Sequence, residues 1–301
     1  MRNHALLKGC AAAIALFLGG IAPLPCAAQM PSEPGYLEST WIKVRQDKVA
    51  EFNQIAVRVA DANRHGKGDN WTAAVDMYGK DNYVWMTSTR ASLSEIEPGM
   101  NKFGGAMKEF MGFSWDRFMA ETSKVTESSG SELRVRRNEL SWNIKDMPSW
   151  LAQVGKAKYL ATAIVQVKPG HMADAEKQLM MIHDAAQGKP EAMAAGVSQV
   201  MFGGNPGTFW IVIPLSELTD LTKMGSPRSL LGEEGYRRYS EMAAQNYANV
   251  DYSLKRFVPE WSNPPAAFVE ANPKFWNVKA PAMAKPKAPT ATAKPAATTG
   301  Q

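Results

Sequence analysis

Cysteine is nearly absent from this sequence, and its two copies, Cys10 and Cys26, both lie within the first 28 residues. The rest of the chain therefore has no thiol with which to form a disulfide, bind a metal or attack a substrate. A disulfide-stapled scaffold, a cysteine metal centre and a cysteine-dependent enzyme are excluded. A chain of this length without cross-links must be stabilised by its hydrophobic core.

Long hydrophobic runs are also missing, and the apolar run AAAIALFLGG at residues 11–20 is too short to span a bilayer. It follows Arg2 and Lys8 and precedes a stretch of small residues, which is the order of a secretory signal peptide cleaved between Ala28 and Gln29. We therefore expect a periplasmic or secreted protein with no transmembrane segment after cleavage. Pro25 stands where a lipidated Cys26 would need a small residue, which argues against a lipoprotein.

Histidine is scarce, with only His65, His171 and His183 beyond the signal segment. No two of them have metal-ligand spacing on one helix, so we expect no metal site. No Ser/His/Asp or Cys/His set can be assembled either. The glycine-rich stretch GGNPG at residues 203–207 joins two predicted strands, so it lacks the helix N-terminus that a phosphate-binding loop needs.

The basic charge of the chain lies at its ends. Seven of the 34 Lys and Arg residues lie there, which leaves 27 basic residues against the 29 Asp and Glu residues of the chain. The seven are Arg2, Lys8, Lys274, Lys279, Lys285, Lys287 and Lys294. Because the central part has no basic stripe, we expect no nucleic-acid partner. From Pro264 onward the composition is that of a disordered Pro/Ala/Lys-rich tail, which either contacts an anionic envelope surface or is a solvated spacer.

Three blocks of the sequence recur in the same order. YLESTWIKVRQDKVAEF (36–52) aligns with YLATAIVQVKPGHMADA (159–175), and Tyr83–Val84–Trp85 aligns with Phe209–Trp210–Ile211. LRVRRNELSW (133–142) aligns with YSLKRFVPEW (252–261), with Arg137 opposite Arg256 and the closing tryptophans coincident. An ordered set of matches indicates an internal repeat.

Each repeat has the same predicted order of elements. A strand (about 37–45; 159–168) precedes an amphipathic helix, and a glycine-turn hairpin follows (71–78 and 82–89; 197–202 and 208–214). A helical region (about 93–120; 215–248) then precedes a fourth strand (132–138; 250–257). The order βαββαβ, found twice, predicts an α+β fold of tandem ferredoxin-like repeats.

The alternation of the first strand of each repeat predicts which residues face the helices. Ile42 and Val44, like Val165 and Val167, should face them, while Trp41, Lys43 and Arg45 face the other side. That second face is mixed rather than polar and must be covered. A second copy of the same sheet covers it, so we expect the repeats to pack as a pseudo-dimer.

The repeats, above all AIVQVKPGHMADAEKQL (163–179) with GVSQVMFGGNPGTFWIVIPLSELTDL (196–221), resemble the dimeric α+β barrel superfamily, in particular its antibiotic-biosynthesis-monooxygenase-like and NIPSNAP-like units. The resemblance covers about residues 36–262. It implies two tandem units in one chain packed as a pseudo-dimeric α+β barrel. The superfamily includes cofactor-free oxygenases, haem-binding enzymes and isomerases, so the resemblance implies a fold rather than an activity.

Polar and aromatic residues of the first repeat suggest a site on the mixed face. An aromatic wall with one carboxylate and several cations suits a small anionic or aromatic ligand, with Asp76 as proton acceptor and Tyr78 as donor. The predicted ligand-binding residues there are Trp41, Lys43, Arg45, Arg134 and Arg136. The second repeat has an apolar set instead, so this site would belong to the first half. The alternative is structural: Arg136 pairs with Asp76, and Trp41 belongs to the core.

His183 lies at the edge of the buried stripe of its helix. Some members of the resembling superfamily bind haem through a helix histidine, and His183 is the candidate ligand for haem here. The alternative is a partly buried histidine satisfied by a hydrogen bond, in which case we expect no cofactor.

These observations predict four segments: a signal peptide (1–28), a first ferredoxin-like unit (29–150), a second (151–263) and the tail (264–301). The leading hypothesis is an exported protein that binds a small hydrophobic or aromatic ligand, or a protein partner, in the space between sheet and helices. The alternatives are a cofactor-free monooxygenase or isomerase, a haem-binding protein, and a structural envelope protein.

Overall fold

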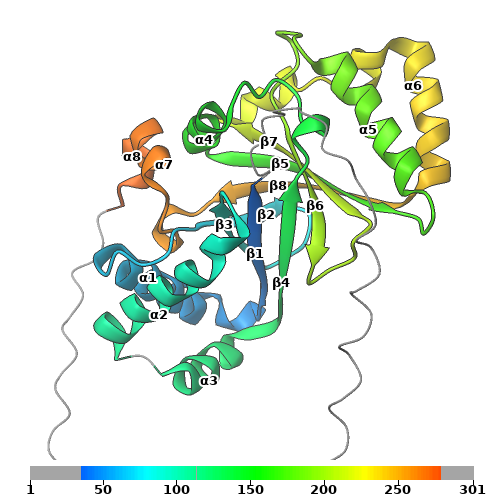
Figure 1. Ribbon diagram of the computed structural model, residues 1–301. Helices are drawn as coiled ribbons and strands as arrows, with labels where there is room; N and C mark the ends of the chain where they lie inside the picture. Colours follow the sequence, from blue (N-terminus) through cyan, green and yellow to red (C-terminus); the bar gives the residue numbers. More distant parts are fainter. Residues whose placement is uncertain (1–34, 113, 279–301) are drawn as a thin grey trace, which may run out of the picture. The chain divides into compact units, whose positions relative to one another are not determined.

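The computed structural model describes residues 35–112 and 114–278, and the fold is given for these residues (Figure 1). The predicted signal peptide (1–28) and the part of the predicted tail beyond residue 278 lie outside them. The strands are β1 (Tyr36–Val44), β2 (Thr72–Tyr78), β3 (Tyr83–Arg90), β4 (Thr126–Arg136), β5 (Tyr159–Val167), β6 (Gly196–Phe202), β7 (Thr208–Leu215) and β8 (Tyr247–Phe257). The α-helices are α1 (Val49–His65), α2 (Ile96–Met111), α3 (Trp115–Val125), α4 (Met147–Lys156), α5 (Met172–Ala186), α6 (Pro227–Asn246), α7 (Ala266–Ala271) and α8 (Pro273–Trp276).

The eight strands form one closed barrel in the order β1-β3-β2-β8-β5-β7-β6-β4. Each half contributes a four-stranded ferredoxin-like sheet, which confirms the predicted pair of βαββαβ units. The halves are joined by antiparallel β2–β8 and β4–β6 ladders. Closure gives each of these eight strands a neighbour on both sides, which is a recurrent way to protect an antiparallel sheet.

Side chains divide between the outside and the inside of the barrel as the strand alternation predicts. Val44 packs with Phe52 of α1, and Val165 and Val167 pack with Leu179 of α5, so these faces carry the helices. Ile164 instead packs inside the barrel with Trp85 and Trp210. The mixed face is therefore the barrel lining, and the two halves cover it for each other.

The ladders correct the predicted alignment of the repeats. Trp41 pairs with Trp85 and Ile164 with Trp210, so Trp85 is equivalent to Trp210, one residue away from the predicted match. Tyr36 pairs with Val135 and Tyr159 with Arg256. Val135, not Arg137, is thus the counterpart of Arg256, and the closing tryptophans are not equivalent.

Each half ends by packing on the other half. After β4, Trp142 joins the buried cluster of the second half, and its Nε1 donates to the Met193 carbonyl at 2.8 Å. After β8, Trp261 packs edge to face on Phe52 of α1, with ring centroids 5.4 Å apart. This exchange resembles the swapped elements of a two-fold dimer.

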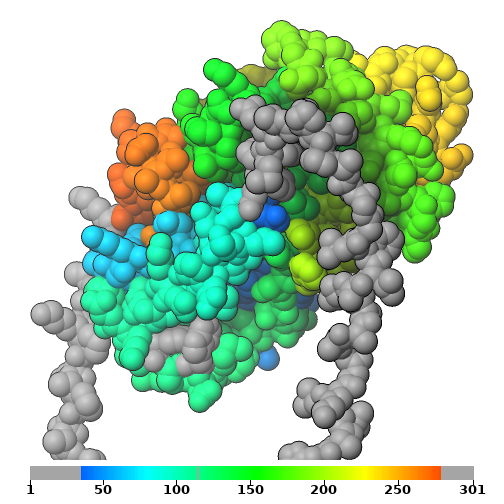
Figure 2. Space-filling view, viewed as in Figure 1, coloured from blue at the N-terminus to red at the C-terminus, as the bar shows by residue number. Residues whose placement is uncertain are grey.

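The first part of the predicted tail is folded. Residues 264–278 contain α7 and α8, and Phe268 and Trp276 are 4% and 2% exposed in a cluster with Phe257. The Trp276 Nε1 donates to the Gly155 carbonyl of α4 at 2.6 Å, and α7 lies against α4 in the space-filling view (Figure 2). The mean composition of residues 264–301 hid these two large aromatic residues, so the prediction of disorder from Pro264 was wrong for 264–278.

The predicted domain boundary between residues 150 and 151 falls inside α4. This helix begins with a capping box in which Asp146 accepts from the Ser149 amide at 2.7 Å, and Pro148 lies in its first turn.

None of the helices in 35–112 or 114–278 combines the length and the apolar character that crossing a bilayer requires.

Candidate functional site

A cleft of about 920 Å³ lies in the first half between the outer face of the sheet and the helices. Its walls are mostly apolar side chains of β1, β3, α1, α2 and α3. They include Ile42, Phe52, Ile55, Ala56, Val59, Met86, Met100, Phe103 and Phe118. Gly104 and Gly105 of α2 also line it, and a Cβ added at either would meet no atom within 4 Å. The helix thus leaves space where a side chain would otherwise stand.

Three charged residues of the cleft, Glu38, Asp69 and Arg90, satisfy one another. The buried Arg90 guanidinium donates to Asp69 at 2.7 and 2.6 Å and to Glu38 at 2.5 Å. These hydrogen bonds raise the pKa of Arg90 above its ordinary value, chiefly through Asp69. Because the Arg90 guanidinium already donates to two carboxylates, few of its N–H groups remain to bind a ligand.

The buried apolar residues of the second half are grouped differently from those of the first half. One continuous cluster links α5, α6 and the sheet, with Leu179, Ile182 and Leu230 among its buried members. In the first half the corresponding apolar residues form two separate clusters, one around Phe52 and Ala56 and one around Val59 and Met107. Phe52, Ala56 and Val59 line the cleft, so the cleft runs along both clusters.

Asp76 is held inside the barrel by two donors. Its carboxylate forms an ion pair with Lys255, and both side chains are almost fully buried. It also accepts from the Trp85 Nε1 at 3.1 Å. Burial lowers the pKa of Lys255, against the effect of its carboxylate partner. The alternative in which Asp76 pairs with Arg136 is wrong, because the partner is Lys255.

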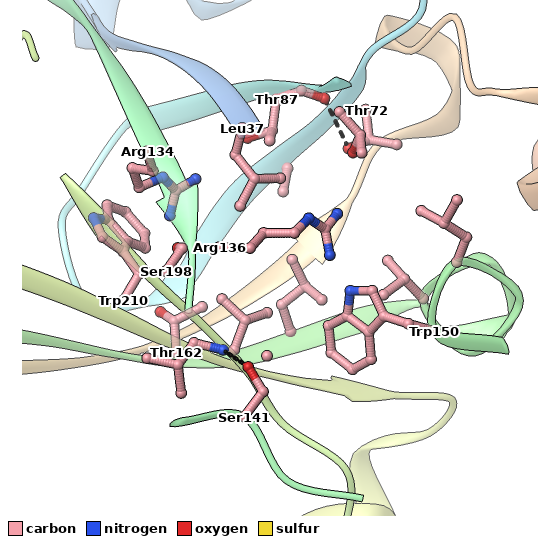
Figure 3. A pocket seen from close by; sticks show the side chains of 18 of the residues that line it. Leu37, Thr72, Thr87, Arg134, Arg136, Ser141, Trp150, Thr162, Ser198 and Trp210 are labelled. Atoms are coloured by element: carbon pink, nitrogen blue, oxygen red, sulfur yellow. Dashed lines mark hydrogen bonds between the residues drawn. The ribbon is translucent and has the colours of Figure 1, made fainter. Parts of the chain in front are cut away.

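Arg134 and Arg136 lie inside the barrel, 4% and 7% exposed. Arg134 donates to the Ser39 hydroxyl at 2.6 Å and stacks on Trp210, with its guanidinium carbon 4.2 Å from the ring centroid. Its Nε lies 3.3 Å from Glu132. Arg136 points into a cavity between Leu37 and Trp150 (Figure 3). Burial lowers the pKa of both arginines to about 10, and Arg134 contributes to the shift of Arg136.

The structure does not bring the other predicted site residues to these arginines. Tyr78 is 71% exposed, because a bulge between Asp76 and Tyr78 interrupts the β2–β8 ladder. Lys43 is half-buried and paired with Glu127 at 2.6 Å, and Arg45 lies beyond the end of β1 with a mostly exposed side chain. Trp41 packs on Tyr83 and on the apolar cluster inside the barrel, as its core alternative predicts. Asp76 and Tyr78 therefore do not form an acid–base pair.

His183 ties α5 to the segment that follows β4. Its Nδ1 lies 2.7 Å from the Ser141 carbonyl oxygen, which is the hydrogen bond that a satisfied histidine makes. His183 lines neither the cleft nor the barrel cavity. The residues around it therefore do not supply a haem pocket in either space. Within 35–112 and 114–278, no three His, Cys, Asp or Glu side chains gather as a metal site would require.

Sequence reasoning missed several residues of the barrel interior, namely Lys255, Glu132, Trp85, Trp210 and Trp150. Lys255 was within reach of the sequence, because an alignment of the repeats that matches Arg134 with Lys255, as the ladders do, places a cation at this position in both halves. Aligning the repeats on their closing tryptophans hid this equivalence. Trp150 belongs to α4, which lies between the two βαββαβ units, and no local sequence pattern predicts that its side chain lines the cavity.

Comparison with models of protein families found no match, and neither did comparison with curated proteins. Several solved structures are similar at low identity. A putative monooxygenase from Lactobacillus acidophilus is 11% identical, with 75% of this chain and 94% of that chain covered and a TM-score of 0.43. An anthrone oxidase-like protein is 11% identical, with 75% and 92% covered and a TM-score of 0.48.

A mutant chlorite dismutase from Candidatus Nitrospira defluvii, in complex with cyanide, is 13% identical, with 79% and 95% covered and a TM-score of 0.44. Similarities at this level concern the fold alone. The closed barrel of two βαββαβ sheets is seen directly in the strand order. The chain folds as a closed α+β barrel, with both βαββαβ halves supplied by one polypeptide.

Proposed function

We propose that this protein is an exported, non-catalytic binding protein that takes a small, largely apolar molecule in the cleft of its first half. The observation that carries the proposal is the cleft itself, about 920 Å³ in one half, where the other half has a continuous core. This volume is at the upper end of the range of small-molecule pockets.

The walls of the cleft favour a ligand with apolar surface. Phe52, Ile55 and Val59 line it together with other apolar side chains. Removing apolar surface of a ligand from water and placing it against these side chains is favourable.

The chemistry of the walls favours a largely apolar ligand with one polar end. Arg90 is already bound to Asp69 and Glu38, so it offers little to an anion. Asn101, Lys108, Ser114 and Thr122 also line the cleft and can meet a polar end of the ligand. Met100 and Phe118 add adaptable and aromatic contacts. A ring system or short chain with one polar end suits this set.

A binding role is preferred to catalysis because the proposed acid–base residues do not meet. Asp76 is paired inside the barrel and Tyr78 is exposed outside it. A general base must lie within hydrogen-bond reach of the proton that it takes. Neither residue lines the cleft.

Gly104 allows a direct test with a matched control. Gly104→Leu projects a side chain into the cleft, whereas Gly104→Ala adds only a methyl group in open space. We expect the leucine variant to bind a neutral naphthylamine dye at least about tenfold more weakly, a change of about 1.4 kcal/mol. The alanine variant should bind like the original protein and gain about 0.5–1 kcal/mol of stability from helix propensity.

Dye fluorescence titration and native mass spectrometry of protein purified gently from its host provide the measurements. The proposal fails if the dye binds equally to the leucine and alanine variants.

A further inference from the structure

The inside of the barrel has a different chemistry from the cleft. We propose that it is a second ligand site, in which Arg136, assisted by Arg134, binds the carboxylate of a small apolar monoanion. The residues of this site line one cavity, to which α4 contributes Trp150, Leu151 and Val154 and α7 contributes Phe268. The proposal does not depend on the cleft.

Arg136 is the central observation. Its side chain is more than nine-tenths buried, and its Nε has no hydrogen-bond partner. Among the described residues it forms no ion pair, although a carboxylate accompanies each of the other buried arginines, Arg90 and Arg134. Burying a charge without a partner is costly, so a folded protein that keeps one there is expected to supply the counter-charge by another means.

Other unpartnered donors surround the same cavity. The Arg134 Nε is paired with a Glu132 carboxylate oxygen at 3.3 Å. Nη1 of Arg134 and Nε1 of Trp210 are buried and have no hydrogen-bond partner, and both residues line the cavity with Arg136 (Figure 3). All of these groups donate. An acceptor group placed between the arginines would satisfy several of them at once, and a carboxylate suits the planar guanidinium fork best among small groups of single charge.

The charges inside the barrel indicate a monoanion. Arg134, Arg136 and Lys255 carry the positive charges, and Asp76 and Glu132 the negative ones. With all five ionised, one positive charge remains. A ligand with one negative charge neutralises it, whereas a dianion would leave an excess of the opposite sign in a space of low dielectric constant.

The rest of the cavity favours an apolar body. Trp85, Trp150 and Trp210 line it together with Leu37, Leu160 and Val212. The hydroxyls of Thr87, Thr162 and Ser198 face the same space. The cavity has a volume of about 120 Å³. That exceeds the ~10–15 Å³ needed by one water many times over and suits one ring or a short branched chain.

Benzoate is the probe, and isothermal titration calorimetry with the full chain is the measurement. Arg136→Met removes the charge and keeps the length of the side chain. It should weaken benzoate binding about ten- to a hundredfold, the usual effect of losing a hydrogen bond to a charged group. Arg137→Met is the matched control, because the neighbouring Arg137 pairs with Glu139 and Glu176 and does not line the cavity. It should change benzoate binding less than about twofold.

Two further variants separate this proposal from the others. Val212→Phe narrows the cavity and keeps both arginines, so it should weaken benzoate binding while formate binding persists. Gly104→Leu blocks only the cleft and should leave benzoate binding unchanged. Failure of the dye to bind in the cleft would therefore not bear on the benzoate result.

Three results would overturn the proposal. The first is equal benzoate affinity in the original protein and Arg136→Met. The second is binding of inorganic phosphate in preference to benzoate. The third is absence of any heat with benzoate and formate at millimolar concentration. If Arg136→Met unfolds, the Val212→Phe comparison decides the matter alone.

Discussion

Trp85 and Trp210 occupy equivalent positions in the two halves and meet edge to face inside the barrel, with ring centroids 4.9 Å apart and planes inclined by 75°. Each tryptophan also lies beneath a cation. Lys255 lies 4.6 Å from the Trp85 ring centroid, and Arg134 lies 4.2 Å from that of Trp210. Lys255 and Arg134 are themselves equivalent positions. The barrel interior is thus pseudo-symmetric in these two rings and two cations, and it departs from symmetry in its carboxylates and in Arg136, whose counterpart is Phe257.

Phenylalanine substitutions at the two tryptophans should differ in cost. Trp85 Nε1 donates to Asp76, whereas Trp210 Nε1 has no partner. Trp85→Phe should therefore destabilise the protein by about 1–3 kcal/mol more than Trp210→Phe, because only the first change removes a hydrogen bond to a buried carboxylate. Urea unfolding of the two variants measures this difference. Equal costs would mean that the Asp76 contact contributes nothing.

The Asp76–Lys255 pair should be more damaging to break than to remove. Lys255→Met leaves a buried carboxylate without its cation, and we expect a loss of about 3–5 kcal/mol. Asp76 is equivalent to Val200 of the second half. The double variant Asp76→Val with Lys255→Met should therefore regain most of that stability, because apolar replacement of a buried ion pair is often neutral or favourable. Thermal unfolding distinguishes the cases, and simple additivity of the two single losses would contradict the coupling.

Glu132 should make stability fall as the pH rises above its ordinary pKa. Burial raises the pKa of Glu132 above 4.5, against the effect of Arg134. Between the ordinary and the raised value the native state binds more protons than the unfolded state, so the free energy of unfolding decreases with pH. Glu132→Gln cannot ionise and should remove this decrease. Urea unfolding between about pH 4 and 7 tests it, and identical slopes for both proteins would show that Glu132 is not the titrating group.

The order of elements was predictable because it depends on local patterns. Alternation in YLESTWIKV and YLATAIVQV, the glycine turns and the helical stripes each report on a few neighbouring residues, and their repetition predicts the pairing of the halves. Gly203 illustrates this: its φ is +80°, and a Cβ there would overlap the Ser131 carbonyl of β4. Only glycine suits such a turn.

The contents of the barrel were less predictable because they depend on register. A single bulge moves Tyr78 out of the barrel while Asp76 stays inside. A two-residue error in aligning β4 with β8 conceals Lys255, the actual partner of Asp76. Arg134 and Arg136 were correctly placed on the inner face because they lie on one regular strand. Their pairing was not predictable, because Arg134 pairs with Glu132 of β4, whereas Asp76 pairs with Lys255 of the distant β8 and leaves Arg136 without a carboxylate.

The folded C-terminal segment should be required for stability, although its composition resembles a linker. Phe268 and Trp276 are almost fully buried, and losing one large aromatic core side chain costs about 3–5 kcal/mol. A chain ending at Asn263 loses both, together with the Trp276 hydrogen bond to Gly155. It should unfold at a much lower temperature than a chain ending at Val278, which keeps every described contact of α7 and α8. Because Phe268 also lines the barrel cavity, the shorter chain should bind benzoate weakly even where it remains folded. Equal melting temperatures for the two truncated chains would show that α7 and α8 add nothing to the barrel.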